Sequence, residues 1–125
     1  MSVIYTKNDK NIVTLCFDMA DRKANVLNQE FIKNFKEALH QLTQEKDLTG
    51  VILTSSKKDF IAGADLEMML AAEEPSEIFA WLEDFKLALR KLETLGAPVV
   101  AAINGSALGG GYEVALACHH RVILN

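Results

Sequence analysis

The chain has 125 residues, 50% of them hydrophobic and 24% charged, which is one domain's length and excludes global disorder. Its 13 Lys and Arg residues against 17 Asp and Glu residues give a net charge of −4. This balance argues against a nucleic-acid-binding protein, which needs a basic surface to displace counterions.

The first half of the chain predicts two strands, a helix and a third strand. Residues 12–17 form a β-branched run that we expect to pair with residues 3–6 across a turn at residues 7–10. Asn28 is a good N-cap for a helix whose apolar positions recur at helical spacing: Phe31, Ile32, Phe35, Leu39 and Leu42. Residues 51–54 are apolar on both faces, which is typical of a buried parallel strand.

A second helix is predicted from Pro75, which suits the first helical turn, to the stop at Gly96 and Pro98. Its expected buried stripe consists of Ile78, Leu82, Phe85, Leu89 and Leu92. Three further elements follow, namely an apolar strand at residues 98–103, a short helix at residues 112–119 and a strand at residues 121–124.

Strands that alternate with amphipathic helices indicate an α/β fold. The sequence ends inside the apolar run at residues 122–124, with no polar cap after it. Because complete domains usually cover such a strand edge, we expect the chain to be a fragment of a longer protein.

No secretory signal and no membrane span are expected. The first ten residues lack an apolar segment, and the longest apolar runs, at residues 98–103 and 114–118, are far too short to cross a bilayer. The two cysteines, Cys16 and Cys118, cannot form a disulfide framework. Reduced thiols and a cytoplasmic location are the expectation.

The glycine run 109–111 lies between a buried strand and a short helix. It is neither a Walker loop, which ends in Lys-Ser/Thr, nor a dinucleotide fingerprint, because Val114 occupies the position of the third glycine. What remains is a helix N-terminus whose backbone N–H groups stabilise negative charge. Glu113 beside them is either a proton-transfer group acting next to a carbonyl or a residue that complements the helix dipole, and the residues favour neither.

Residues 60–65 form a second glycine-containing loop, which also follows a predicted strand. Gly63 would let the N–H of Ala64 face a ligand. Taken alone, the pattern favours a simpler interpretation, a strand-to-helix turn capped by Asp65.

Several motifs in this order resemble the enoyl-CoA hydratase/isomerase (crotonase) family: Asn25-Val-Leu27, Phe60-Ile-Ala-Gly-Ala-Asp65, Pro98-Val-Val-Ala-Ala-Ile-Asn-Gly105 and Ala107-Leu-Gly-Gly-Gly-Tyr-Glu113. The likeness is greatest to multifunctional alpha chains of bacterial fatty-acid oxidation complexes, in which a 3-hydroxyacyl-CoA dehydrogenase region follows. It implies a crotonase-like (ClpP/crotonase) spiral of ββα turns, of which residues 1–125 are the N-terminal part.

The resemblance also implies roles for individual residues. The backbone N–H groups of Ala64 and Gly110 would form an oxyanion hole for the thioester carbonyl. Glu113 would be the first of two catalytic glutamates, and the second would lie beyond Asn125. The remaining implied substrate and coenzyme A contacts are Lys23, Ala24, Ala62, Asp65, Leu66 and Gly109.

The implied reaction is hydration of trans-2-enoyl-CoA in β-oxidation. The alternatives are a Δ3-Δ2-enoyl-CoA isomerase, or a non-catalytic piece that binds coenzyme A or contributes to assembly. The implied partners are an acyl-CoA thioester and either further copies of the chain or a thiolase subunit. No metal or redox cofactor is expected, with NAD required only if a dehydrogenase region follows, and the piece alone is expected to be inactive.

Four other features have simpler interpretations. Cys118-His119-His120 cannot converge easily on one metal ion, so a histidine complementing the helix dipole is favoured. Lys57-Lys58 is expected to be a solvated turn rather than a contact to coenzyme phosphates. Phe79 and Trp81 favour core or subunit contacts, and Met68-Met69 favours core packing over an acyl pocket.

Overall fold

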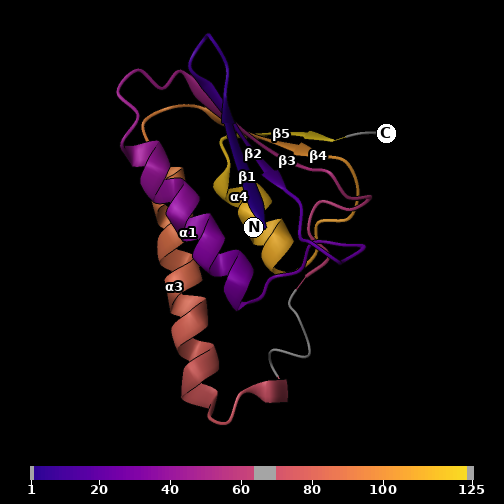
Figure 1. Ribbon diagram of the computed structural model, residues 1–125. Coiled ribbons are helices and arrows are strands. Elements are labelled where there is room, and N and C mark those ends of the chain that lie inside the picture. The colour runs from indigo at the N-terminus through magenta and orange to yellow at the C-terminus, as the bar shows by residue number, and fades with distance from the viewer. Residues whose placement is uncertain (1, 64–69, 124–125) are drawn as a thin grey trace.

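The computed structural model describes residues 2–63 and 70–123. Its centre is a mixed sheet with the strand order β1-β2-β3-β4-β5 (Figure 1). The first strand pairs antiparallel with the second, and the other pairs are parallel. The strands are β1 (Val3–Lys7), β2 (Ile12–Phe17), β3 (Gly50–Ser55), β4 (Val99–Ile103) and β5 (His120–Ile123).

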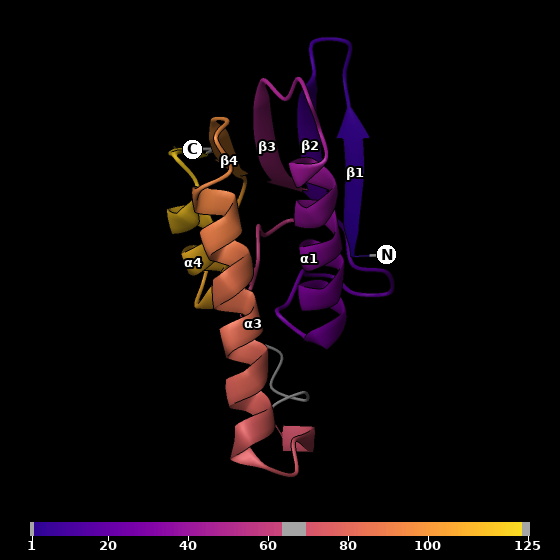
Figure 2. The same cartoon turned by 90° about the vertical axis from the view of Figure 1, so that its left-hand side faces the viewer.

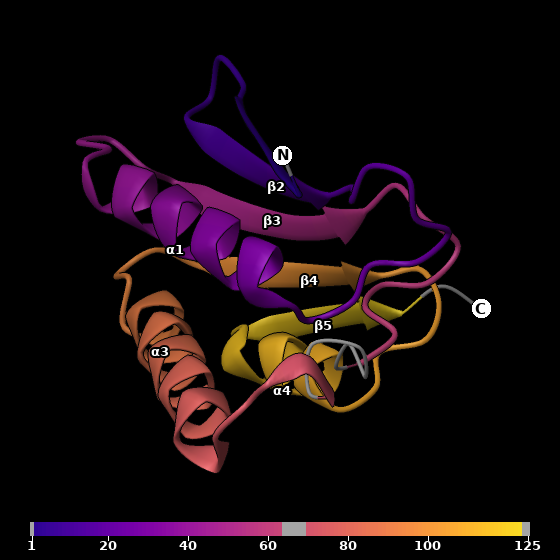
Figure 3. The same cartoon turned by 60° about the horizontal axis from the view of Figure 1, so that its bottom comes forward.

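The helices described in full lie on one side of this sheet (Figures 2 and 3), namely α1 (Gln29–Thr43), α3 (Pro75–Glu93) and α4 (Gly110–Ala117). The predicted start of α1 is confirmed, because the Asn28 side chain accepts a hydrogen bond of 2.8 Å from the Phe31 N–H. Pro75 occupies the first turn of α3, also as predicted. Within the described residues, no helix is long and apolar enough to cross a membrane.

The core lies between the helices and one face of the sheet. Val13, Val51 and Val99 lie side by side on β2, β3 and β4 and are buried. The residues that alternate with them, such as Ile52 and Val100, are only partly buried. The expectation that residues 51–54 and 98–103 are buried on both faces is therefore wrong, because the described helices cover a single face.

Four phenylalanines join the sheet, α1 and the loop after β3. The ring of Phe17, at the end of β2, lies 5.1 Å from that of Phe31 and 5.5 Å from that of Phe60, in both cases edge to face. Phe35 stacks on Phe31 at 5.9 Å. All four side chains are fully buried, so aromatic packing anchors the loop that contains Phe60.

Some element boundaries and faces differ from the sequence-based expectation. Helix α4 begins and ends two residues earlier than predicted, and β5 begins one residue earlier, at His120. On α3 the buried positions are Phe85, Ala88 and Leu92, whereas Leu82 is 45% exposed. Leu82 was expected to be buried because its helical spacing is correct, but no neighbouring described element covers it completely.

Candidate functional site

Three loops follow the carboxyl ends of the parallel strands β2, β3 and β4, namely residues 18–28, 56–63 and 104–109. In open α/β sheets this edge is where ligands bind. The loops after β3 and β4 are joined by three backbone hydrogen bonds. The N–H groups of Phe60 and Ile61 both donate to the Ser106 carbonyl, at 3.0 and 3.2 Å, and the Leu108 N–H donates to the Ile61 carbonyl at 3.1 Å. The two predicted ligand loops therefore form a single unit.

The loop after β2 holds the other side of this unit. The Ala62 N–H donates to the Asn25 carbonyl, and the Leu27 N–H donates to the Gly63 carbonyl, each at 2.8 Å. Residues 60–63 are thus hydrogen-bonded on both sides. This arrangement places Ala62 next to Asn25, in the segment that follows Lys23 and Ala24.

Glycines allow the loops to approach each other closely. Gly63 and Gly109 both have positive φ angles, 122° and 51°. A Cβ atom added to Gly109 would lie 3.9 Å from the Cα of Gly63, so the two backbones face each other. At Gly111 an added Cβ would lie only 2.6 Å from the Ile61 carbonyl oxygen, which leaves no room for a side chain.

Helix α4 begins at this glycine junction and carries Glu113 in its first turn. The Glu113 N–H donates to the Gly109 carbonyl at 3.1 Å, which closes the first helical turn. Gly110 is the first helical residue, a position whose N–H has no acceptor within an α-helix. The exposed Glu113 side chain lines an open groove of about 210 Å³ between α3 and α4, together with Leu89, Arg90 and others.

Of the other predicted site residues, Lys23 and Gly109 are exposed, whereas Ala24 and Ala62 are partly buried. Ala64, Asp65 and Leu66 lie outside the described residues, as do Met68 and Met69. Gly109, Gly110 and Glu113 therefore share the start of α4, where the Glu113 side chain lies in the groove next to α3, and Ala62 is held beside the segment that follows Ala24.

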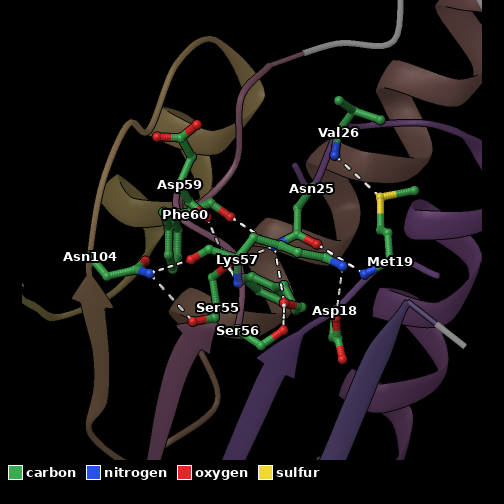
Figure 4. A network of polar contacts seen from close by, with 11 residues as sticks. Asp18, Met19, Asn25, Val26, Ser55, Ser56, Lys57, Asp59, Phe60 and Asn104 are labelled. Carbon is green, nitrogen blue, oxygen red and sulfur yellow. Dashed lines mark hydrogen bonds and ion pairs between the residues drawn. The ribbon is translucent and has the colours of Figure 1, made fainter. Parts of the chain in front are cut away.

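Asn25 is the residue that sequence analysis overlooked (Figure 4). Its side chain is fully buried. Its Oδ1 accepts the Met19 N–H at 3.1 Å, and its Nδ2 lies 2.8 Å from Ser55 Oγ and 3.0 and 3.1 Å from the carbonyl oxygens of Phe17 and Phe60. An asparagine flanked by Ala24 and the apolar Val26-Leu27 was the available signal, but it entered the analysis only as part of a matching motif.

Lys57 is not the solvated residue that was expected. Its ammonium group pairs with Asp18 at 2.9 Å, and only 18% of its side chain is exposed. The hydrogen bond from Lys57 holds the pKa of the Asp18 carboxyl below its ordinary value. Because this ion pair joins the loops after β2 and β3, Lys57 is engaged within the protein, whereas Lys58 is exposed.

His119 also differs from expectation. It lies after the end of α4, and its Nδ1 accepts the Val99 N–H at 2.9 Å while its Nε2 lies 3.1 Å from the Glu93 carbonyl oxygen. A neutral ring protonated on Nε2 satisfies both contacts. His119 therefore connects the end of α3 to the start of β4 instead of complementing the dipole of α4.

The described residues contain no group of three or more side chains arranged to hold a metal ion. Cys16 and Cys118 are both free thiols, on β2 and after α4. Burial raises the pKa of the Cys118 thiol to about 12, which keeps it protonated and unreactive at neutral pH.

Comparisons with known proteins show the family and the fold of the chain. The sequence model of the enoyl-CoA hydratase/isomerase family matches residues 8–124, and the chain belongs to this family. Among curated proteins it is 40% identical over 118 residues to the fatty acid oxidation complex subunit alpha of Shewanella halifaxensis, and 39% identical to that of Shewanella oneidensis. These matches cover 94% of this chain but only 17% of each relative.

Solved structures confirm the crotonase-like fold. An enoyl-CoA hydratase from Bacillus anthracis superimposes with a TM-score of 0.89 and 30% identity, and one from Mycobacterium smegmatis with a TM-score of 0.91 and 24% identity. Each match covers 98% of this chain and about half of the other chain, 47% and 48% respectively. The expected α/β architecture is thereby confirmed.

Proposed function

We propose that residues 1–125 are the N-terminal part of an enoyl-CoA hydratase domain that acts in fatty-acid β-oxidation in the cytoplasm. The observation that carries this proposal is the junction of Gly63 and Gly109 at the start of α4, with Glu113 one helical turn further on. A helix N-terminus that stabilises an anion and a carboxylate in the same helical turn are the two groups that proton transfer next to a thioester requires.

In the proposed reaction, the thioester oxygen accepts hydrogen bonds from the N–H groups of Gly110 and Ala64. Water adds across the double bond of trans-2-enoyl-CoA: it gives up one proton to a carboxylate as its oxygen forms a bond to C3, and a carboxylic acid delivers one proton to C2 of the enolate. Glu113 carries out one of these two proton transfers, and a second carboxylate outside this chain carries out the other. Backbone dipoles supply the activation of the carbonyl, since they lower the energy of the developing oxyanion.

The coenzyme A part of the substrate is proposed to lie along the partly buried Ala24 and Ala62, with exposed Lys23 and Gly109 at its edges. Asp65 and Leu66 are proposed to line the acyl path. The hydrogen bond between the Ala62 N–H and the Asn25 carbonyl supports this grouping, because it holds the two segments side by side.

The relatives also motivate proposals for the full-length protein. Their shared description as subunits of a fatty acid oxidation complex supports assembly with a thiolase subunit or with further copies of the chain. A 3-hydroxyacyl-CoA dehydrogenase region that uses NAD is the expected continuation. The match covers 17% of those relatives, which leaves room for such a region in proteins of their length.

The test is a paired assay of the purified full-length protein. A short trans-2-enoyl-CoA is expected to lose the absorbance of its conjugated thioester as the hydroxyacyl product forms. A cis-3-enoyl-CoA is supplied in parallel, and conversion of this substrate alone would assign the isomerase reaction instead. Binding of acyl-CoA in calorimetry without turnover of either substrate would identify a non-catalytic binding module and reject the enzyme proposal.

A further inference from the structure

We propose that Asn25 is a positioning residue that sets the oxyanion-hole loop, an inference that rests on the proposed function. Asn25 touches neither of the proposed reacting groups. It acts instead through residues 60–63, whose backbone leads to the first proposed oxyanion donor and faces Gly109 next to the second.

The side chain of Asn25 joins three segments at a point that water does not reach. Its amide nitrogen has two hydrogens and three acceptors within 3.1 Å: the carbonyl of Phe17 from β2, the hydroxyl of Ser55 from β3, and the carbonyl of Phe60 from the loop. Its amide oxygen accepts the Met19 N–H. Every polar atom of the side chain is therefore engaged, which is the condition under which a buried polar group rigidifies its surroundings.

Backbone hydrogen bonds from residues 25–27 fix further positions of the loop after β3. The Asn25 carbonyl accepts the Ala62 N–H, and two residues later the Leu27 N–H donates to Gly63. The loop is thus fixed to the Asn25 segment at Phe60, Ala62 and Gly63, on the side opposite its bonds to the loop after β4. A shift of Asn25 would be transmitted to the spacing between Gly63 and Gly109.

The amide group of Asn25 is required to hold the loop in this position. Aspartate has nearly the same shape and retains an oxygen for the Met19 N–H, but its second oxygen would face the carbonyl oxygens of Phe17 and Phe60. Because like charges and lone pairs repel at this distance, the loop would move away from β2. Filling the space is therefore not sufficient, and the donor atoms of the amide are needed.

The experiment compares Asn25→Asp and Asn25→Ser with Asn8→Ala in the full-length protein. Asn8 is the matched control, because its side chain accepts the N–H groups of Lys10 and Ile12 in the turn at the opposite end of β2. We expect both Asn25 variants to lower kcat by about 10- to 100-fold with KM changed less than about threefold, as for a misplaced oxyanion donor. Asn8→Ala is expected to lower the midpoint of unfolding and leave kcat unchanged.

A second measurement needs no variant. In the wild-type protein, we expect the backbone amide hydrogens of Ala62 and Leu27 to exchange as slowly as that of Leu53, which lies in a buried strand. Ala62 and Leu27 lie in loops, where amide exchange is ordinarily fast. Exchange at rates typical of exposed loops would overturn the proposal, and so would a folded Asn25 variant with wild-type kcat. If the wild-type protein converts neither enoyl-CoA, the proposed function fails instead, and the exchange result still reports whether the loop is held to the backbone of the Asn25 segment.

Discussion

Glu113 and Gly110 are neighbours in the first turn of α4, yet they contribute different chemical groups. Glu113 offers an exposed carboxylate, and Gly110 offers only its backbone N–H. Substitutions at the two positions can therefore test proton transfer and oxyanion stabilisation separately. Each variant needs a control variant that keeps the chemical group under test.

Glu113→Gln in the full-length protein is expected to lower hydratase turnover by about 10²–10⁴-fold, because the amide keeps the shape but cannot exchange a proton. Acyl-CoA binding, measured by calorimetry, is expected to remain nearly unchanged. Glu77→Gln is the matched control, since Glu77 is the acidic residue in the first turn of α3 and has no place in the site. Equal turnover in the two variants would mean that Glu113 only complements its helix dipole.

Gly110→Pro is expected to lower turnover by about 10²–10³-fold, because it removes one oxyanion donor. Proline is well tolerated at the first helical position, so α4 should still form. Circular dichroism establishes that the variant is folded, and Gly110→Ala, which retains the N–H, provides the comparison. Full activity in a folded Gly110→Pro protein would contradict the assignment of this N–H to the oxyanion hole.

At the scale of elements, the C-terminal end of α4 is held by side chains of the residues that follow it. Arg121 donates to the carbonyls of Ala115 and Cys118, each at 3.2 Å, and so satisfies two acceptors at that end of the helix. His119 then ties the chain to Val99 and to the end of α3 through its ring. These contacts fix the orientation of the helix that carries Glu113.

His119→Ala is expected to lower the free energy of unfolding by about 1–3 kcal/mol, because the Val99 N–H loses its acceptor in a partly buried place. His120→Ala, at the exposed neighbouring position, is expected to change it by less than about 0.5 kcal/mol. Urea unfolding followed by circular dichroism measures both values. Equal effects of the two substitutions would contradict a bridging role for His119.

At the scale of the whole molecule, the sheet is covered on one face by α1, α3 and α4 (Figure 3), and its last strand is exposed. All four residues of β5 are exposed, among them Val122 at 61% and Ile123 at 69%. A strand with an open edge and apolar side chains offers a template for pairing with another chain. The solved relatives extend to about twice the length matched here.

Residues 1–125 expressed alone are expected to self-associate and to show no hydration of a short enoyl-CoA. The physical reasons are the open edge of β5 and the single catalytic carboxylate, Glu113, of the proposed pair. Light scattering and the absorbance assay described above measure the two properties. A monodisperse monomer with robust hydratase activity would contradict this prediction and would place both catalytic groups within these residues.

The sequence by itself determined the features that depend on near neighbours along the chain. The cap at Asn28 and the apolar spacing of α1 are local, so the helix could be predicted with its buried face. The glycines at 63 and 109 indicated loops with unusual backbone conformations, because few other residues adopt their backbone angles. The motifs that contain them were sufficient to indicate the family.

Only the tertiary structure decided features that join distant parts of the chain. Asn25 contacts residues up to 35 positions away, and Lys57 pairs with Asp18 across two loops. The exposure of Leu82 likewise depends on which elements lie against α3 and not on its helical period. A side chain's periodicity predicts the direction in which it points, but its burial and its partners are set by which other segments the fold brings to the same place.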